Sequence, residues 1–291
     1  MRKFSFRLHG LFFAFVATFC RATFCLAALC LAPMAAPAQT ALATRSAQDQ
    51  AADDALLNKA RTLYYSTAKA GLAGFDCTVN PDWLATFVKA NQGATISSND
   101  ARVLLLNQVA IVLHAQLKNG NTSMDWTPPA GALTSDQTDL LNQMHSASQQ
   151  ALEGFIQFWT PFVDGSVIPD NSSGMTVTHT LSAITFHAEA SGTSVTEVFS
   201  NDLLLEHYDV VTGGTSIKFE PSYKATPQGL LVEHFLAYIQ KADDPSAPIQ
   251  EMHVAVQYQT IDGFPIPSRL DMEVVGTGVF NMALNQCTVR R

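Results

Sequence analysis

The chain has 291 residues, of which 47% are hydrophobic and 14% are charged, and its formal net charge at pH 7 is −8. That length and composition suit a folded protein with a large apolar core. Removing the first 38 residues takes away four Lys and Arg residues and no acidic residue, which leaves 13 basic against 25 acidic side chains and a net charge of −12. Because no cluster of Lys or Arg follows residue 38, this charge argues against nucleic acid and anionic lipid headgroups as partners.

The N-terminus has the pattern of a secretory signal. Three basic residues within the first seven precede a mostly apolar stretch over 11–31, and Ala36-Pro37-Ala38 is a small-x-small cleavage site. The alternative is a retained membrane anchor, but Arg21 divides the stretch into pieces shorter than the about 20 apolar residues that span a bilayer. The sequence therefore predicts a signal peptide over 1–38 and a periplasmic or secreted protein.

Mainly helices are expected between residues 53 and 162. After a flexible leader over 39–52, Asp53 and Asp54 begin a helix that Gly71 and Gly74 end. Asn80 is the expected cap of the next helix, with Pro81 at its first position. The other elements expected here are a strand over 75–79, a short helix over 99–106, a strand over 109–117, a loop over 119–133 and a long helix from Thr134 to near Pro161, opened by a capping box formed with Gln137.

From residue 175 onward the apolar period changes from 3.6 to 2, the period of a half-buried β-strand. About eight strands are expected between 175 and 289. They are joined by turns at Ser191-Gly192, Gly213-Gly214, Asp262-Gly263 and Gly276-Thr277-Gly278. Short turns pair consecutive strands antiparallel, so the expected fold class is α+β, with a single domain over 53–291 and a helical insertion around 81–162.

Two cysteines remain after the predicted cleavage. Cys77 lies in the first expected strand and Cys287 in the last. In an oxidising compartment two such thiols form a bridge, and we predict a disulfide between them. The alternative is two separate cysteines that serve as small apolar core residues.

The long helix has a broad aromatic stripe that includes Phe155, Phe158, Trp159 and Phe162. One interpretation is a core helix packed on the sheet, which is the commoner role of such a stripe. The other is a lid in the mouth of a curved sheet, where these four side chains line an apolar cavity for an acyl chain. Both interpretations stay open at the level of sequence.

No catalytic or nucleotide-binding motif occurs in the mature chain, so no enzyme, no catalytic residue and no cofactor is predicted. A weak metal alternative is the set His187, Glu189, Glu251 and His253. Each His–Glu pair is spaced by two residues and shares a strand face, so adjacent strands would unite them into a metal-binding patch. The bland alternative is a solvated surface, since the opposite face of both strands is apolar.

The segment from Tyr258 to Pro267, with its Asp262-Gly263 turn, resembles the terminal hairpin of the LolA/LolB-like half-barrel group of periplasmic lipoprotein carriers. Gly278 and a last strand ending at Val289 follow, and the order of the earlier elements is similar. The resemblance implies a curved antiparallel sheet, a half-barrel of about 8–10 strands, wrapped around the N-terminal and inserted helices. It further implies that the concave face holds lipid moieties, and it carries over no individual binding residue.

The sequence thus predicts an exported, non-enzymatic binding protein for a lipid, a lipoprotein acyl chain or another apolar ligand. The first alternative is a cell-envelope interaction or scaffold domain with a solid core and no ligand. The second is a hydrolytic or metal-dependent activity, which requires the two His–Glu strands to be adjacent.

Overall fold

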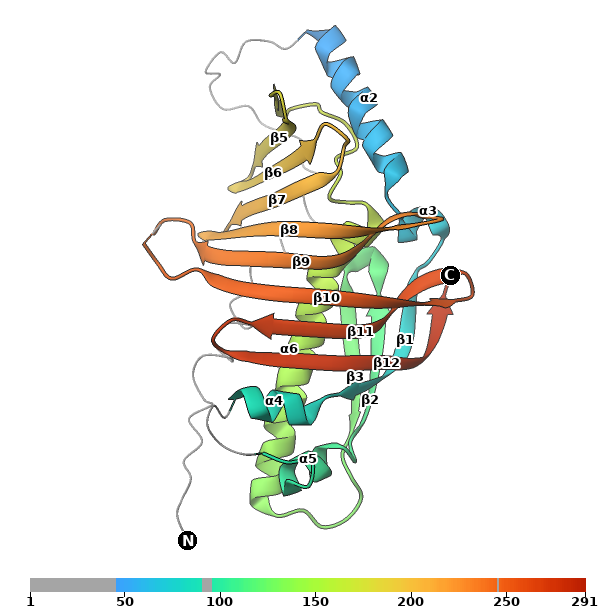
Figure 1. Cartoon of the computed structure of the whole chain (residues 1–291), viewed down its shortest axis with the longest axis vertical. Helices are drawn as coiled ribbons and strands as arrows, with labels where there is room; N and C mark the ends of the chain where they lie inside the picture. The colour runs from blue at the N-terminus through green and yellow to red at the C-terminus, as the bar shows by residue number, and fades with distance from the viewer. Residues whose placement is uncertain (1–45, 91–95, 245) are drawn as a thin grey trace. The chain divides into compact units, whose positions relative to one another are not determined.

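The computed structural model describes residues 46–90, 96–244 and 246–291 (Figure 1). The predicted signal peptide over 1–38 and residues 39–45 of the predicted leader lie outside these residues. The helices are α2 (Ala47–Leu63), α3 (Thr67–Ala70), α4 (Trp83–Ala90), α5 (Ala101–Leu106), the 3-10 turn η2 (Leu117–Asn119) and α6 (Ser135–Asp164). In the part of the chain described, no helix combines the length and the hydropathy that a membrane crossing requires.

The strands form one antiparallel sheet in the order β3-β2-β1-β12-β11-β10-β9-β8-β7-β6-β5-β4, with β3 and β4 at its open edges. They are β1 (Gly74–Pro81), β2 (Ala110–Gln116), β3 (Asn121–Thr127), β4 (Thr176–His179), β5 (Ala183–Ala190), β6 (Thr193–Ser200), β7 (Leu205–Thr212), β8 (Thr215–Thr226), β9 (Gly229–Lys241), β10 (Gln250–Ile261), β11 (Phe264–Val274) and β12 (Gly278–Arg290). The predicted fold class, α+β with a curved antiparallel sheet, is confirmed. The sheet has twelve strands, more than the predicted eight to ten.

Part of the extra count comes from β3, which lies in the expected loop over 119–133. Gly120 adopts a left-handed conformation with φ of +60° and returns the chain, so that β3 pairs with β2 from Gln116↔Asn121 to Ala110↔Thr127. The β3 sequence alternates exposed and half-buried residues and has no fully buried position. Because β3 is an edge strand without a buried apolar face, its sequence has no apolar period that would predict a strand.

The predicted hairpin turns are confirmed. At the β5–β6 and β10–β11 turns, two consecutive residues have positive φ: Ser191 (+51°) and Gly192 (+77°), then Asp262 (+50°) and Gly263 (+87°). Two consecutive positive φ values make the turn whose twist matches that of antiparallel strands, and Gly, Asn and Asp favour it. The turn residues therefore set the register of the meander locally.

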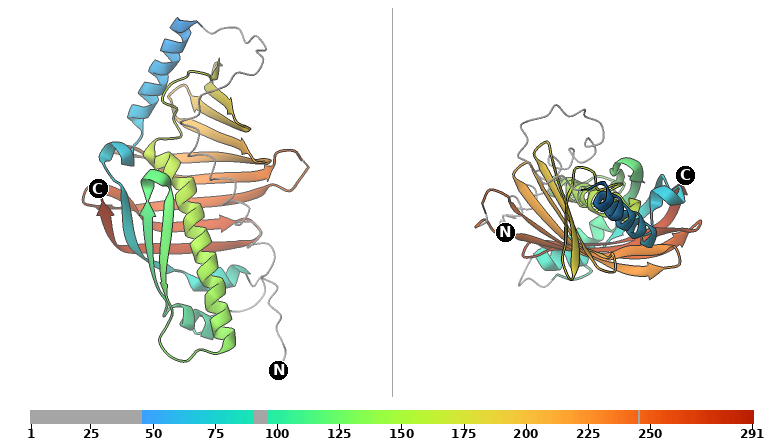
Figure 2. Two further views of the ribbon diagram at one scale, coloured as in Figure 1. Left: turned by 180° about the vertical axis from the view of Figure 1, so that it is seen from behind. Right: turned by 90° about the horizontal axis from the view of Figure 1, so that it is seen from above.

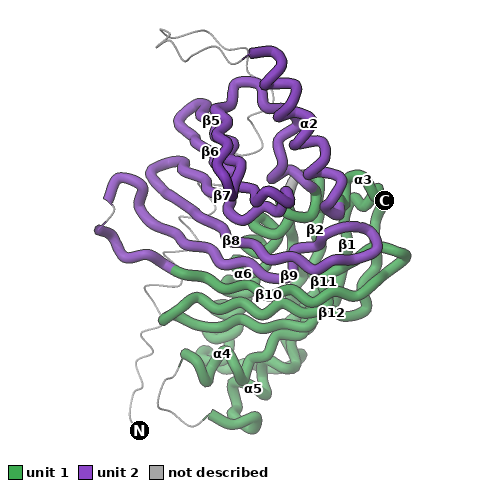
Figure 3. The backbone as a smooth tube through the Cα atoms, turned by 45° about the horizontal axis from the view of Figure 1, so that its top comes forward, with its two compact units in different colours: residues 1–21, 66–164, 251–291 green, residues 22–65, 165–250 purple. Residues whose placement is uncertain are grey.

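The chain folds into two compact units (Figure 3). Among the described residues, unit 1 contains 66–164 and 251–291, with α3–α6, β1–β3 and β10–β12. Unit 2 contains 46–65 and 165–250, with α2 and β4–β9. A single domain over 53–291 with a helical insertion around 81–162 stays a prediction.

In unit 1, α6 runs beside β2 and β3 (Figure 2). Its predicted capping box is present: the Thr134 side chain accepts a hydrogen bond from the Gln137 backbone N–H at 3.3 Å, and the Gln137 side chain accepts one from the Thr134 N–H at 2.9 Å. The helix continues past Pro161 to Asp164, because the buried Phe162 and Val163 pack in the last turn.

The helix that follows β1, α4, does not begin at the predicted residue. Pro81 is the last residue of β1, and Asp82 takes the capping role that the sequence assigned to Asn80. The Asp82 carboxylate accepts a hydrogen bond from the Ala85 backbone N–H at 2.9 Å. Pairing of Pro81 with Met282 in β12 extends the strand over the expected cap.

In unit 2, α2 begins at Ala47, inside the predicted flexible leader. Ser46 caps it by accepting a hydrogen bond from the Asp49 N–H at 3.1 Å. Asp53 and Asp54 are therefore interior residues and not the helix start. Asp54 accepts hydrogen bonds from the backbone and side chain of Ser172, both at 2.7 Å, and Asp53 lies 2.8 Å from His179 Nε2 in β4.

The end of α2 is joined to β9 at Gly229. The Tyr65 N–H donates to the Leu230 carbonyl at 2.9 Å. A Cβ on Gly229 would lie 2.7 Å from the Tyr65 nitrogen and 2.8 Å from the Tyr64 carbonyl carbon, and its φ is +123°. Both the close backbone approach and the backbone conformation therefore require glycine here.

Candidate functional site

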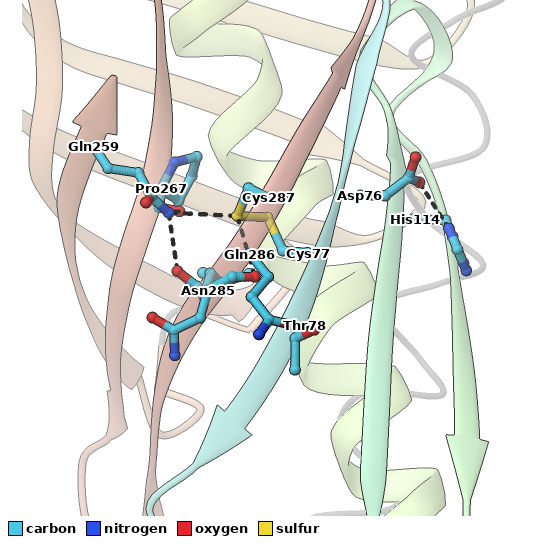
Figure 4. The surroundings of a disulfide bond; sticks show 10 residues. Asp76, Cys77, Thr78, His114, Gln259, Pro267, Asn285, Gln286 and Cys287 are labelled. Atoms are coloured by element: carbon cyan, nitrogen blue, oxygen red, sulfur yellow. Dashed lines mark hydrogen bonds and ion pairs between the residues drawn. A yellow bond between two sulfur atoms is a disulfide. The ribbon is translucent and has the colours of Figure 1, made fainter. Parts of the chain in front are cut away.

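The predicted disulfide between Cys77 and Cys287 is confirmed (Figure 4). It joins β1 to β12, which are neighbours in the sheet, and the two Cα atoms are 4.2 Å apart. The β1–β12 register shifts between Asp76 and Thr78, where β12 has one extra residue and Gln286 has φ of +48°. The disulfide therefore lies at a β-bulge, with Cys77 and Cys287 at the point where the register shifts.

The disulfide is a buried structural element of unit 1. Cys77 is 1% exposed and Cys287 is 9% exposed. The Gln259 side-chain amide of β10 donates to the Leu284 carbonyl at 2.9 Å and lies 3.4 Å from Cys287 Sγ (Figure 4). Because little of either sulfur is exposed to solvent, the bridge serves to tie the chain and is poorly placed for thiol exchange.

Removing the bridge with Cys77→Ser and Cys287→Ser is expected to lower the free energy of unfolding of unit 1 by about 2–4 kcal/mol, because the bond closes a long loop in the unfolded chain. All three tryptophans lie in unit 1, so urea denaturation followed by tryptophan fluorescence measures this unit. Wild-type protein under reducing conditions is the control and should approach the double variant. An unchanged midpoint in both would contradict the expectation.

A charged cluster ties four strands together beside the disulfide. Asp76 of β1 lies 2.7 Å from His114 Nδ1 of β2 (Figure 4). Arg290 Nη1 of β12 lies 2.5 Å from the same carboxylate. His114 Nε2 lies 3.2 Å from Asp125 of β3. The hydrogen bond to Asp76, and then that to Asp125, raise the pKa of His114. The cluster is an electrostatic tie across β3, β2, β1 and β12.

All four aromatic residues predicted on α6 are buried in unit 1. Phe155, Phe158, Trp159 and Phe162 are 3%, 8%, 0% and 2% exposed. Trp159 stacks on Phe155 with ring centroids 5.6 Å apart, meets Phe75 of β1 edge-on at 6.2 Å and donates its indole N–H to the Tyr258 hydroxyl at 2.9 Å. These contacts favour the packing interpretation, and a ligand-lining role stays a prediction.

The metal alternative lacks the adjacency that it requires. His187 and Glu189 lie on β5 and Glu251 and His253 on β10, and four strands, β6 to β9, stand between these in the sheet order. His187 Nδ1 is 2.8 Å from the Thr196 hydroxyl, and His253 Nε2 is 2.5 Å from Glu251. Within the described residues, no group of three or more His, Cys, Asp and Glu side chains is placed to hold a metal ion.

Unit 2 contains a candidate site that the sequence analysis missed. Glu197 of β6 is 4% exposed and lies on the buried face of the sheet, directly between Phe186 of β5 and Tyr208 of β7. The same row continues to Phe219 of β8. We call the buried face of β5–β8 around this carboxyl the Glu197 face; its side chains are Ile184, Phe186, Glu197, Phe199, Tyr208, Val210, Ile217 and Phe219.

Aromatic pairs flank the carboxyl on both sides. Phe186 and Phe199 meet edge-on with centroids 5.9 Å apart, and Tyr208 and Phe219 lie 6.0 Å apart. Directly opposite residues on neighbouring strands have Cβ atoms about 4.5–5.5 Å apart, so Glu197 is within contact range of both rows. A single carboxyl therefore sits in an aromatic wall.

The environment of Glu197 favours its neutral form. Burial raises the pKa of Glu197 to about 8, and a hydrogen bond from its own backbone N–H offsets this in part. The side-chain oxygen Oε2 is buried and has no hydrogen-bond partner. A buried polar atom without a hydrogen-bond partner lowers the stability of a protein by about 1–3 kcal/mol, so the lack of a partner at Oε2 needs a physical reason.

A sequence signal for Glu197 does exist. In the strand over 193–200, Val195 and Phe199 mark the apolar side of the period-two pattern, and Glu197 falls between them on that side. An acidic residue at an inward position of a strand is rare unless it is paired or functional. Because Glu197 belongs to no catalytic or metal-binding motif, this inward position is its only signal in the sequence.

Comparison of the chain with family models, with curated proteins and with solved structures gives no match.

Proposed function

We propose that this chain is an exported, non-enzymatic binding protein that carries a lipid or another apolar ligand on the apolar face of its sheet. The observation that carries the proposal is the Glu197 face, a wall of aromatic and aliphatic side chains across β5–β8 with one buried carboxyl. Apolar walls with a few placed polar groups are typical of small-molecule sites. The likeness of the terminal hairpin to the LolA/LolB-like group supports the same proposal.

Chemistry elsewhere in the chain supports a location outside the cytosol. The Cys77–Cys287 bond is of the kind that persists in oxidising compartments. The N-terminal pattern of basic, apolar and small residues supports export to the periplasm or beyond. Acidic net charge supports an uncharged or cationic ligand over anionic partners.

Lipid extraction tests the proposal. Protein purified from its native envelope is extracted with organic solvent, and we expect the mass spectrum to show a stoichiometric amphiphile. Titration of delipidated protein with a fluorescent fatty alcohol is then expected to saturate, with about tenfold weaker binding in Phe199→Ala than in Trp159→Ala. Clean extracts together with the absence of saturable binding would refute the carrier. Weaker binding in Trp159→Ala alone would move the ligand to the α6 residues.

A second candidate function is a cell-envelope interaction or scaffold domain with a solid core. The ring contacts of Trp159 with Phe75 and Phe155 favour it, because they fill the space beside α6 with side chains. The extraction experiment separates the two, since a scaffold domain yields no bound amphiphile.

A further inference from the structure

The unmet oxygen of Glu197 narrows the chemistry of the ligand. The neighbours of Glu197 on the adjacent strands are Phe186 and Tyr208, and the residue is 4% exposed. The other buried polar pair on this face, Thr193 and Thr212, is satisfied internally at 2.9 Å. The position of Glu197 thus combines a carboxyl that lacks a partner at Oε2 with aromatic rings on both neighbouring strands.

Three classes of apolar ligand would interact differently with the buried carboxyl and the neighbouring aromatic rings. A fatty carboxylate would have to share one proton with Glu197, and above about pH 8, where this carboxyl is ionised, it would place a second negative charge beside it, which opposes binding. A fatty alcohol would supply one hydrogen bond and no charge. An ammonium head would form an ion pair with the ionised carboxyl and interact with the electron-rich faces of the surrounding rings, which together are the usual elements of an ammonium site.

We propose that the Glu197 face recognises a ligand with an apolar body and an organic ammonium head, with Glu197 as the counter-ion and Phe186, Phe199, Tyr208 and Phe219 as the surrounding rings. This inference rests on the proposed carrier function and adds the chemical class of the headgroup. No covalent step is involved. On binding, the neutral carboxyl of Glu197 loses its proton to solvent and the ammonium head replaces that proton as its partner.

The charge balance makes binding depend on pH. Near pH 7 the carboxyl is mostly protonated, so ammonium binding releases close to one proton, and affinity rises as the pH increases from 6 to 9. Tyr208 is the titratable neighbour on β7. His179 of β4 pairs with Ile184 of this face and lies 2.8 Å from Asp53 of α2, and the Tyr64 hydroxyl accepts a hydrogen bond from the Leu205 N–H of β7 at 2.7 Å. His179→Gln therefore serves as the control for a histidine contribution.

The test uses three probes of equal chain length: decylammonium, 1-decanol and decanoate. Isothermal titration calorimetry is carried out below the micellar concentrations on delipidated full-length mature protein, with thermal melts to show that each variant is folded. At pH 8.5 we expect wild-type protein to bind the ammonium probe at least tenfold more tightly than the alcohol, and decanoate most weakly. Proton release, measured at pH 7 in buffers of different ionisation enthalpy, is expected for the ammonium probe only.

Two variants probe the two parts of the site. Glu197→Gln keeps the side-chain size and is expected to remove the ammonium preference while leaving decanol affinity within about twofold. Phe186→Leu is expected to weaken the ammonium probe about three- to fivefold more than it weakens decanol, which corresponds to a cation–π contribution at a partly desolvated site. Glu206→Gln, an exposed carboxylate on β7, is the matched control and should bind like wild type.

The outcomes separate the headgroup from the carrier. Saturable decanol binding without an ammonium preference, or a preference that survives Glu197→Gln, overturns the headgroup assignment and leaves the carrier standing. A pH dependence that disappears in His179→Gln and persists in Glu197→Gln also overturns it. Failure of all three probes to bind folded wild-type protein overturns both proposals, and Glu197 is then a buried neutral acid of the core.

Discussion

Replacing Glu197 by glutamine is expected to remove most of the loss of stability that unit 2 suffers as the pH rises from about 4.5 to 8. In the folded protein the carboxyl keeps its proton up to a pKa of about 8, against 4.5 for the group in an unfolded chain. Between these values unfolding releases a proton, so increasing pH favours the unfolded state. The stability is fully present below pH 4.5, and the loss by pH 8 is on the order of 4 kcal/mol.

Denaturation with urea at pH 5 and pH 8, followed by far-ultraviolet circular dichroism, measures this effect, while tryptophan fluorescence follows unit 1 in the same samples. We expect the urea concentration at the unfolding midpoint to be lower at pH 8 than at pH 5 for wild-type protein. For Glu197→Gln this midpoint is expected to change little. Glu206→Gln has the same chemical change at an exposed site and should keep the wild-type slope. A wild-type slope in Glu197→Gln would show that the carboxyl is ionised and solvated in the folded state.

Truncating Trp159 to alanine is expected to lower the free energy of unfolding of unit 1 by about 3–5 kcal/mol, the usual cost of removing a large aromatic side chain from a core. The side chain is 0% exposed and contacts Phe75 and Phe155. Its hydrogen bond to Tyr258 is lost as well. Fluorescence of the remaining Trp83 and Trp126 in a urea titration measures the change.

Two control variants divide this effect into its parts. Tyr258→Phe removes only the hydrogen bond at 2.9 Å and is expected to cost about 0.5–1.5 kcal/mol. Trp126→Ala removes a half-buried tryptophan that stacks on His145 at 5.2 Å, and should cost less than Trp159→Ala. Equal effects of the two tryptophan truncations would contradict a solid core around α6 and favour an open space beside Trp159.

Local chemistry in the sequence determined several parts of this protein. The Thr134–Gln137 capping box, the hairpin turns at Ser191-Gly192 and Asp262-Gly263, and the period-two strands after residue 175 depend on residues close together in the chain. Their geometry follows from backbone preferences and short-range hydrogen bonds, so the pattern suffices. The Cys77–Cys287 pair was equally readable, because only two cysteines remain after residue 38.

Other features were decided only by the tertiary structure, because these features depend on which distant segments of the chain come into contact. The β3 strand exists through pairing with β2, and the partners of Asp53 and Asp54, His179 and Ser172, come from segments more than 100 residues away. The two His–Glu strands were shown to be separate by the strand order alone. Glu197 acquires its neutral form from rings on two other strands and from the exclusion of water, and no neighbour in its own sequence supplies either.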